Sequence, residues 1–183
     1  MRSGANASAR CGRLCLLAFA AVFLLTSPPG WGQGWSVVRS PSGSGQAAST
    51  ISADGHRLYI WAKHLDDRSL VFAELHLENG DEFAGRMPIY RIDGGEPVDT
   101  ERVRREGEKQ GSLWGFVAGR ACFRLIWASN HPVVDANDHL AQWMTGKTLA
   151  ITYEAADGVE KNVDFDLDGA RGAIQKAASV TLP

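Results

Sequence analysis

Three aspartates at alternate positions form the pattern closest to a metal-binding loop. Asp164, Asp166 and Asp168, followed by Gly169, match the opening of an EF-hand calcium loop. Calcium also needs a closing bidentate carboxylate, and the residue at that position here is Gln175. Apolar residues alternate with the aspartates, which is typical of a strand that turns its carboxylates to solvent. The pattern therefore favours a solvated strand over a calcium site.

A second group of possible metal ligands combines imidazoles and carboxylates. His131, Asp135, Asp138 and His139 lie within one short segment. Zinc and related metals use such donors, but a structural site needs four of them in tetrahedral geometry. A polar loop that caps a helix beginning at His139, with Asn137 or Asp138 as N-cap, explains the same residues. From the two patterns we predict neither a metal nor another cofactor.

The candidate nucleophiles are poorly placed for catalysis. Ser112 directly follows Gly111, so the Gly-x-Ser-x-Gly spacing of a nucleophile elbow fails. Cys122 stands in an apolar run, which indicates a buried structural thiol more than a reactive one. The sequence therefore favours a protein without catalytic residues and leaves an enzyme as the alternative.

The first 32 residues have the pattern of a secretory signal. Three arginines precede an uninterrupted apolar run from Leu14 to Leu25, and this segment contains no acidic residue. Twelve helical residues reach only about 18 Å, well short of a hydrocarbon core of roughly 30 Å. We expect cleavage near Gly32, a single domain over 33–183 with no membrane segment, and a periplasmic or secreted protein.

The charge balance excludes one class of partner. The chain carries 19 Lys and Arg against 21 Asp and Glu. Without the three arginines of the signal segment, 16 basic residues face 21 acidic ones, a net charge of −5. A mildly acidic domain lacks the electrostatic footprint of a nucleic-acid-binding protein, so we expect no nucleic acid partner.

Beyond the signal segment, apolar and polar residues alternate with a period of two. Such alternation predicts half-buried strands, and Asx and glycine turns separate the runs at hairpin spacing. Two short helices are predicted at His139–Thr145 and Ala170–Ala178, the latter with Asp168 as N-cap. The prediction is an all-β fold: one antiparallel β-sandwich or flattened barrel with a short C-terminal helix. The predicted strands are Trp35–Arg39, Arg57–Lys63, Ser69–Leu77, Met87–Ile92, Cys122–Ala128, Lys147–Glu154 and Asn162–Leu167.

Several of these segments resemble a known family. Met144–Tyr153, the Asp157-Gly158 turn and Val163–Ala170 resemble the C-terminal half of the invasion-associated locus B family. Tyr90–Gly95 and Trp35–Val38 resemble its central hairpin and opening strand. The resemblance implies a small exported bacterial β-sandwich protein, and it supplies no catalytic residues.

One strand face offers an interaction surface. Tyr59 and Trp61 alternate with Leu58 and Ile60, so the two aromatic rings should share the face opposite the apolar core. We therefore expect a non-enzymatic envelope module that binds or assembles with an envelope or extracellular protein. The alternatives are a metal-dependent or hydrolytic envelope enzyme and an inhibitor that inserts the charged segment 101–111 into a partner enzyme.

Overall fold

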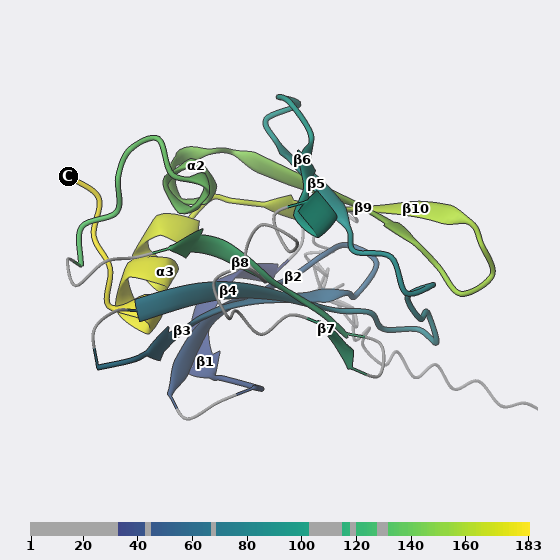
Figure 1. Ribbon diagram of the computed structural model, residues 1–183, viewed down its shortest axis with the longest axis horizontal. Coiled ribbons are helices and arrows are strands. Elements are labelled where there is room, and N and C mark those ends of the chain that lie inside the picture. Colours follow the sequence, from purple (N-terminus) through teal and green to yellow (C-terminus); the bar gives the residue numbers. More distant parts are fainter. Residues whose placement is uncertain (1–32, 43–44, 67–68, 103–114, 118–119, 128–131) are drawn as a thin grey trace, which may run out of the picture.

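The computed structural model describes residues 33–183 apart from 43–44, 67–68, 103–114, 118–119 and 128–131 (Figure 1). Within β7 and most of β8 only the backbone pairing is described. The predicted signal segment, Ser112 and His131 lie outside the described residues. No helix among the described residues is long and apolar enough to cross a membrane.

Six strands form the larger sheet, in the order β1-β2-β3-β4-β8-β7, and all neighbours are antiparallel. The first four follow one another along the chain because short turns join them. One of these turns contains Gly55 at φ 89°, a left-handed backbone conformation that glycine adopts easily. The strands are β1 (Gln33–Arg39), β2 (Gln46–Ile51), β3 (Arg57–His64), β4 (Ser69–His76), β7 (Gly115–Val117) and β8 (Arg120–Trp127).

Four further strands form a second antiparallel sheet in the order β10-β9-β5-β6. These strands are β5 (Ile89–Ile92), β6 (Val98–Asp99), β9 (Thr148–Glu154) and β10 (Glu160–Asp166). The turn after β5 is fixed by Asp93, whose carboxylate accepts hydrogen bonds from the backbone N–H groups of Lys147 and Thr148 at 2.8 Å. These two bonds attach the β5–β6 hairpin to the start of β9.

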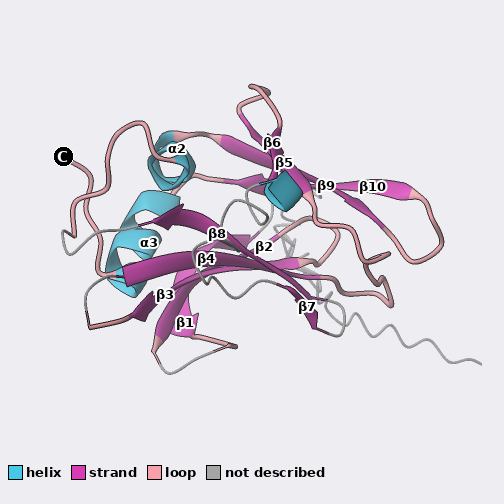
Figure 2. Ribbon diagram, in the orientation of Figure 1, coloured by secondary structure: helices cyan, strands magenta, loops and turns pink. Residues whose placement is uncertain are grey.

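Besides the helical residues 100–102, the described part of the chain contains two short helices, α2 (His139–Thr145) and α3 (Ala170–Ala178). Helix α3 packs across β1, β2 and β3 on the side facing the second sheet (Figure 2). Its N-cap is Gly169 in the left-handed conformation, so the prediction of Asp168 as N-cap is wrong by one residue. Glycine takes this position because the chain must turn there at φ 83°, which favours a residue without Cβ.

The core lies between the larger sheet on one side and the second sheet with helices α2 and α3 on the other. Alternate residues of β4 (Val71, Ala73 and Leu75) join it, as the strand pattern predicts. The second sheet contributes Leu149 and Ile151, both fully buried. The prediction of an all-β fold with a C-terminal helix is therefore confirmed at the level of two antiparallel sheets. Neither sheet closes on itself among the described strands, so the structure is not a barrel.

Candidate binding surface

The face of the larger sheet turned away from the core carries aromatic and charged side chains. We call Tyr59, Trp61, Phe72, Glu74, His76 and Arg120 the outer-face cluster. Strand pairing brings these residues together, because Tyr59 lies opposite Glu74 and Trp61 opposite Phe72 in the β3–β4 register. On the other side of β4, His76 lies opposite Arg120 of β8. Three adjacent strands thus place their polar and aromatic groups in one band.

Glu74 is the centre of this cluster and is only 2% exposed. Its Oε1 is 2.8 Å from His76 Nε2 and accepts a hydrogen bond from Arg120 Nη1 at 3.3 Å. Trp61 Nε1 donates to its other oxygen, Oε2, at 3.1 Å. A buried carboxylate is costly unless such partners compensate it. Here Trp61, His76 and Arg120, from three strands, take part in that compensation.

The ionisation of Glu74 follows from these contacts. Burial raises the pKa of its carboxyl, but hydrogen bonds from His76 and Ser42 and the charges of His76 and Arg120 lower it by more. The net pKa lies below its ordinary value, so Glu74 is an anion at neutral pH. A fixed anion therefore holds the side chains around it.

The aromatic rings of the cluster are fixed by stacking. The Trp61 and Phe72 rings lie nearly parallel, with centroids 4.6 Å apart and planes at 22°. Tyr59 packs against the imidazole of His76, with centroids 4.8 Å apart. Tyr59 and Trp61 remain only half-buried, so part of each ring is available for contact. Rings held in this way lose little conformational entropy on binding, which favours recognition.

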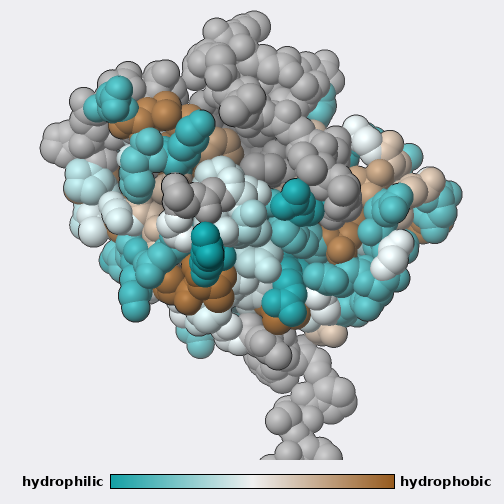
Figure 3. Space-filling model, turned by 90° about the horizontal axis from the view of Figure 1, so that it is seen from below, coloured by the Kyte–Doolittle hydropathy of each residue, from teal (hydrophilic) through white to brown (hydrophobic). Residues whose placement is uncertain are grey.

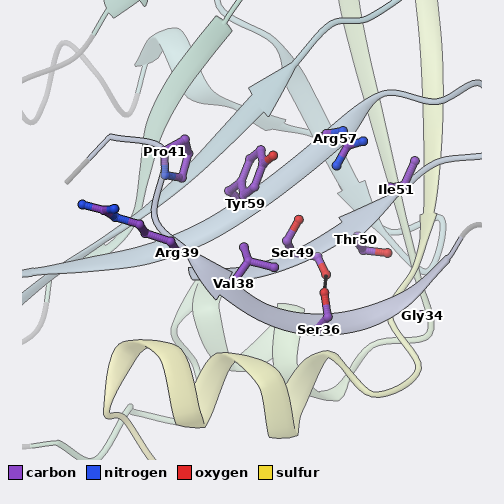
Figure 4. Close-up of a pocket in the computed structure, with 10 residues that line it drawn as sticks. All are labelled: Gly34, Ser36, Val38, Arg39, Pro41, Ser49, Thr50, Ile51, Arg57 and Tyr59. Carbon is purple, nitrogen blue, oxygen red and sulfur yellow. Dashed lines mark hydrogen bonds between the residues drawn. The ribbon is translucent and has the colours of Figure 1, made fainter. Parts of the chain in front are cut away.

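A hollow of about 290 Å³ adjoins the cluster over β1, β2 and β3 (Figure 4). Ser36 and Ser49 lie on its floor, and the Ser36 hydroxyl donates to the backbone oxygen of Ser49 at 3.5 Å. Tyr59 belongs to both the hollow and the cluster. From the side of the larger sheet, the coloured part of the surface shows small apolar areas among hydrophilic ones (Figure 3). This composition fits a mixed polar and apolar ligand.

The candidate metal ligands around His139 do not converge in the described residues. Asp135 is exposed, and its Oδ1 accepts a hydrogen bond from the backbone N–H of Asn137 at 2.8 Å. Asp138 is the N-cap of α2, and burial together with the charge of Asp135 raises its pKa. The His139 ring packs edge-on against Tyr90, with centroids 6.2 Å apart. No group of three or more His, Cys, Asp or Glu suited to a metal occurs among the described residues.

The three aspartates near the C-terminus are all exposed. Asp164 and Asp166 lie on β10, opposite Ala150 and Thr148 of β9. Asp166 Oδ1 accepts a hydrogen bond from the backbone N–H of Asp168 at 2.8 Å. One oxygen of the EF-hand-like carboxylates therefore accepts a hydrogen bond within the turn that leads into α3.

A second polar cluster, around Asp81, joins parts of the chain that no sequence pattern connects. Tyr153 donates a hydrogen bond to Asp81 Oδ2 at 2.8 Å, and Lys161 Nζ lies 2.7 Å from Oδ1. The buried His56 presents Nε2 at 3.9 Å from Oδ2. The cluster thus ties the turn before β3 to β9 and β10 of the second sheet. The hydrogen bonds from Lys161 and Tyr153 lower the pKa of Asp81.

Because the pKa of Asp81 is lowered by folding, its carboxylate stabilises the native state above its ordinary pKa. That contribution should be lost as the pH falls through the lowered value. Replacing Asp81 with Asn should cost about 1 kcal/mol at neutral pH, with the difference from wild type shrinking in acid. Denaturant unfolding at several pH values measures this. Asp164→Asn, an exposed strand carboxylate, is the control, and an equal loss in both variants would contradict the prediction.

Cys122 is the single cysteine outside the predicted signal segment. It lies in β8 between β4 and β7, opposite Glu74 and Gly115. Its cross-strand neighbour Glu74 is only 2% exposed, so a thiol beside it should also be poorly accessible, and we predict slow labelling in the native protein and no intermolecular disulfide. A thiol-labelling time course with and without denaturant, together with non-reducing gels, tests this. Rapid native labelling or a dithiothreitol-sensitive dimer would overturn it.

Comparison with known proteins yields no relative: no family model, curated protein or solved structure matches this chain. The fold and the outer face therefore define only a class, that of two-sheet antiparallel domains with a preformed aromatic and charged surface.

Proposed function

We propose that this chain is an exported, non-enzymatic module that binds an envelope or extracellular protein through the outer face of its larger sheet. The observation that carries the proposal is the buried Glu74 and the side chains that it holds. A buried ionic group contributes little net stability, and apolar residues of similar volume often serve as well. An ionised group that fixes Trp61, His76 and Arg120 on the side away from the core is better explained by recognition.

Export and location are part of the same proposal. They are supported by the arginines and short apolar run of residues 1–32 and by the resemblance to the invasion-associated locus B family. The two antiparallel sheets are compatible with the β-sandwich that this family implies, and we propose that arrangement for the domain. The periplasm or the exterior is then where the partner would be met.

The test is capture of a partner by the full-length chain, expressed in a bacterial host with a C-terminal tag and purified after export. Envelope proteins retained by wild type are quantified beside those retained by Tyr59→Ala and by Val159→Ala. Val159 is 53% exposed and lies in the β9–β10 turn of the other sheet, so it is a matched apolar control. The proposal expects one partner to be lost with Tyr59→Ala and retained with Val159→Ala. Equal retention by both variants would refute it.

A further inference from the structure

We propose that the outer edge of β1 pairs with β1 of a second copy of this chain, so that the two larger sheets join into one continuous sheet. The inference goes beyond the proposed function, because it concerns the edge of the larger sheet and not its outer face. The pairing is antiparallel, with a twofold axis at Val37. It is supported by the lack of protection at this edge, by the direction of its backbone groups and by the charges that the pairing brings together.

Among the strands that the structure describes, β1 forms the edge that is most open to pairing. It lies at one margin of the larger sheet (Figure 1), and the other three edges are β7, β6 and β10. Short length protects β6 and β7, which have two and three residues. Exposed charges at Glu160, Asp164 and Asp166 protect β10. β1 has seven residues, contains no proline and carries one charge, that of Arg39 at its end. Such an edge is a template for a strand from another chain.

The backbone groups of β1 alternate between β2 and the outer edge. The N–H of Ser40 donates to the backbone oxygen of Gly45 at 3.0 Å, in register with the rest of the β1–β2 ladder. Residues at even positions of this stretch therefore direct their N–H and C=O groups to β2. Val37 and Arg39 direct theirs outward, where they can pair with a further strand.

A twofold axis at Val37 makes the pairing self-complementary. Val37 then lies opposite Val37 of the second copy, and Arg39 lies opposite Trp35, because the two are equally far from the axis. Trp35 and Val37 both pack against the core, and Arg39 follows them on the same face by the alternation of the strand. The pairing thus places apolar side chains at the axis and a guanidinium beside an aromatic ring on either side of it. Both kinds of cross-strand pair are favourable.

The turn beside Trp35 supplies the counter-charge for Arg39. Trp35 Nε1 donates to the backbone oxygen of Asp166 at 2.8 Å, so the indole lies against the turn that follows β10. Asp166 and Asp168 are exposed, and neither has an ion-pair partner among the described residues. Arg39 is likewise exposed and without an ion-pair partner in the part of the chain that the structure describes. Pairing of two copies brings each Arg39 to the acidic turn of the other copy.

A second copy fits this edge better than an extended segment of another protein. Any strand can pair with the outward backbone groups of Val37 and Arg39. The charge match is more demanding, because it needs an acidic group level with Arg39 and a cation level with Trp35. The chain itself provides both at the same spacing, and the twofold axis uses each of them twice.

The first test measures association of the full-length chain, purified after export, by sedimentation equilibrium from micromolar to millimolar concentration. Arg39→Glu and Asp168→Arg each place like charges at the contact, and the double variant restores the pair with its signs exchanged. Arg91→Glu, which reverses an exposed arginine of β5, is the matched control. We expect a dimer in wild type and in the control. Each single reversal should raise the dissociation constant about tenfold, since it acts twice, and the double variant should recover most of the loss.

The second test examines the register by disulfide crosslinking in a Cys122→Ala background. An axis at Val37 places Ser36 opposite Val38 of the second copy, and both residues are exposed on the outer face. Directly opposite positions suit a disulfide, whereas positions two residues apart do not. Oxidation of an equal mixture of Ser36→Cys and Val38→Cys proteins should therefore give the mixed dimer much faster than either protein gives its own.

Three results would overturn the inference. They are a monomer at every concentration, a dissociation constant that Arg39→Glu leaves unchanged, and a mixed crosslink that forms no faster than the other two. Capture of a partner that depends on Tyr59 is measured separately, so failure of the dimer leaves the proposed function standing.

Discussion

Replacing Glu74 with Ala should destabilise the domain by about 3 kcal/mol, because three side chains lose their shared acceptor. Arg120 and His76 would keep their positions beside a cavity without a counter-charge, and the indole N–H of Trp61 would lose its hydrogen bond to Glu74. Urea unfolding at neutral pH measures the change. Glu160→Ala, at an exposed position of β10, is the matched control and should change stability by less than about 0.5 kcal/mol.

The same site gives a pH signature. The pKa of Glu74 is lowered in the folded state. Its carboxylate therefore stabilises the native state at pH values above its ordinary pKa, and this stabilisation is lost as the pH falls through the lowered value. Glu74→Gln keeps the shape and one acceptor but not the charge. Its stability should therefore decline less steeply in acid than that of wild type. If Glu74→Ala behaved like the Glu160→Ala control, the central position of Glu74 would be wrong.

Replacing Trp143 with Ala should cost about 4 kcal/mol, the largest loss expected from a single core substitution. Trp143 of α2 is fully buried, and its ring meets Tyr90 edge-on with centroids 5.2 Å apart. Removing it leaves a cavity between α2 and β5 that the surrounding residues cannot fill. Denaturant unfolding measures the loss.

Trp61→Ala is the matched comparison, because Trp61 is half-buried on the outer face. It should cost clearly less than Trp143→Ala, since a partly exposed ring leaves a site that solvent can fill. Equal losses in the two variants would mean that the outer face is part of the stabilising core, which would contradict its assignment as a binding surface.

The strands with clear alternation could be predicted from the sequence, whereas β2 and the two short strands β6 and β7 could not. In β3, β9 and β10, buried residues alternate with more exposed ones because one face meets the core. Strand β4 is instead buried at every position from Leu70 to Leu75. In β2 the small residues from Ala47 to Thr50 are all buried, so no alternation marks the strand. Helix α3, whose buried residues include Ala170 and Ala173, packs against β2, and Ala48 of this strand belongs to the core. This contact is tertiary and leaves no periodic signal.

Strand β8 shows another limit. Its sequence predicts strict alternation, but the pairing with β4 shifts between Val71 and Phe72. As a result Phe123 lies opposite Ala73, and Ile126 lies opposite Val71. Ala73 and Val71 are core positions of β4. A bulge of this kind depends on the partner strand and cannot be read from β8 alone.

Only part of the candidate site could be predicted from the sequence. The period of two predicted that Tyr59 and Trp61 share a face, and they do. Nothing local marks Glu74 as their partner, because Arg120 joins it from 46 residues away through the pairing of β4 with β8. The hollow likewise depends on the register of three strands. Charge clusters assembled by sheet pairing are visible only once the order of the strands is known.

Site-specific photocrosslinking in living cells tests the central claim most directly. Benzoylphenylalanine is placed at Tyr59, on the outer face beside the hollow, or at Val159, in the β9–β10 turn of the other sheet. Recognition through the outer face predicts a discrete crosslinked adduct with an envelope or extracellular protein from position 59 and none from position 159. An adduct from position 159 alone, or no adduct at position 59, would contradict recognition through the outer face.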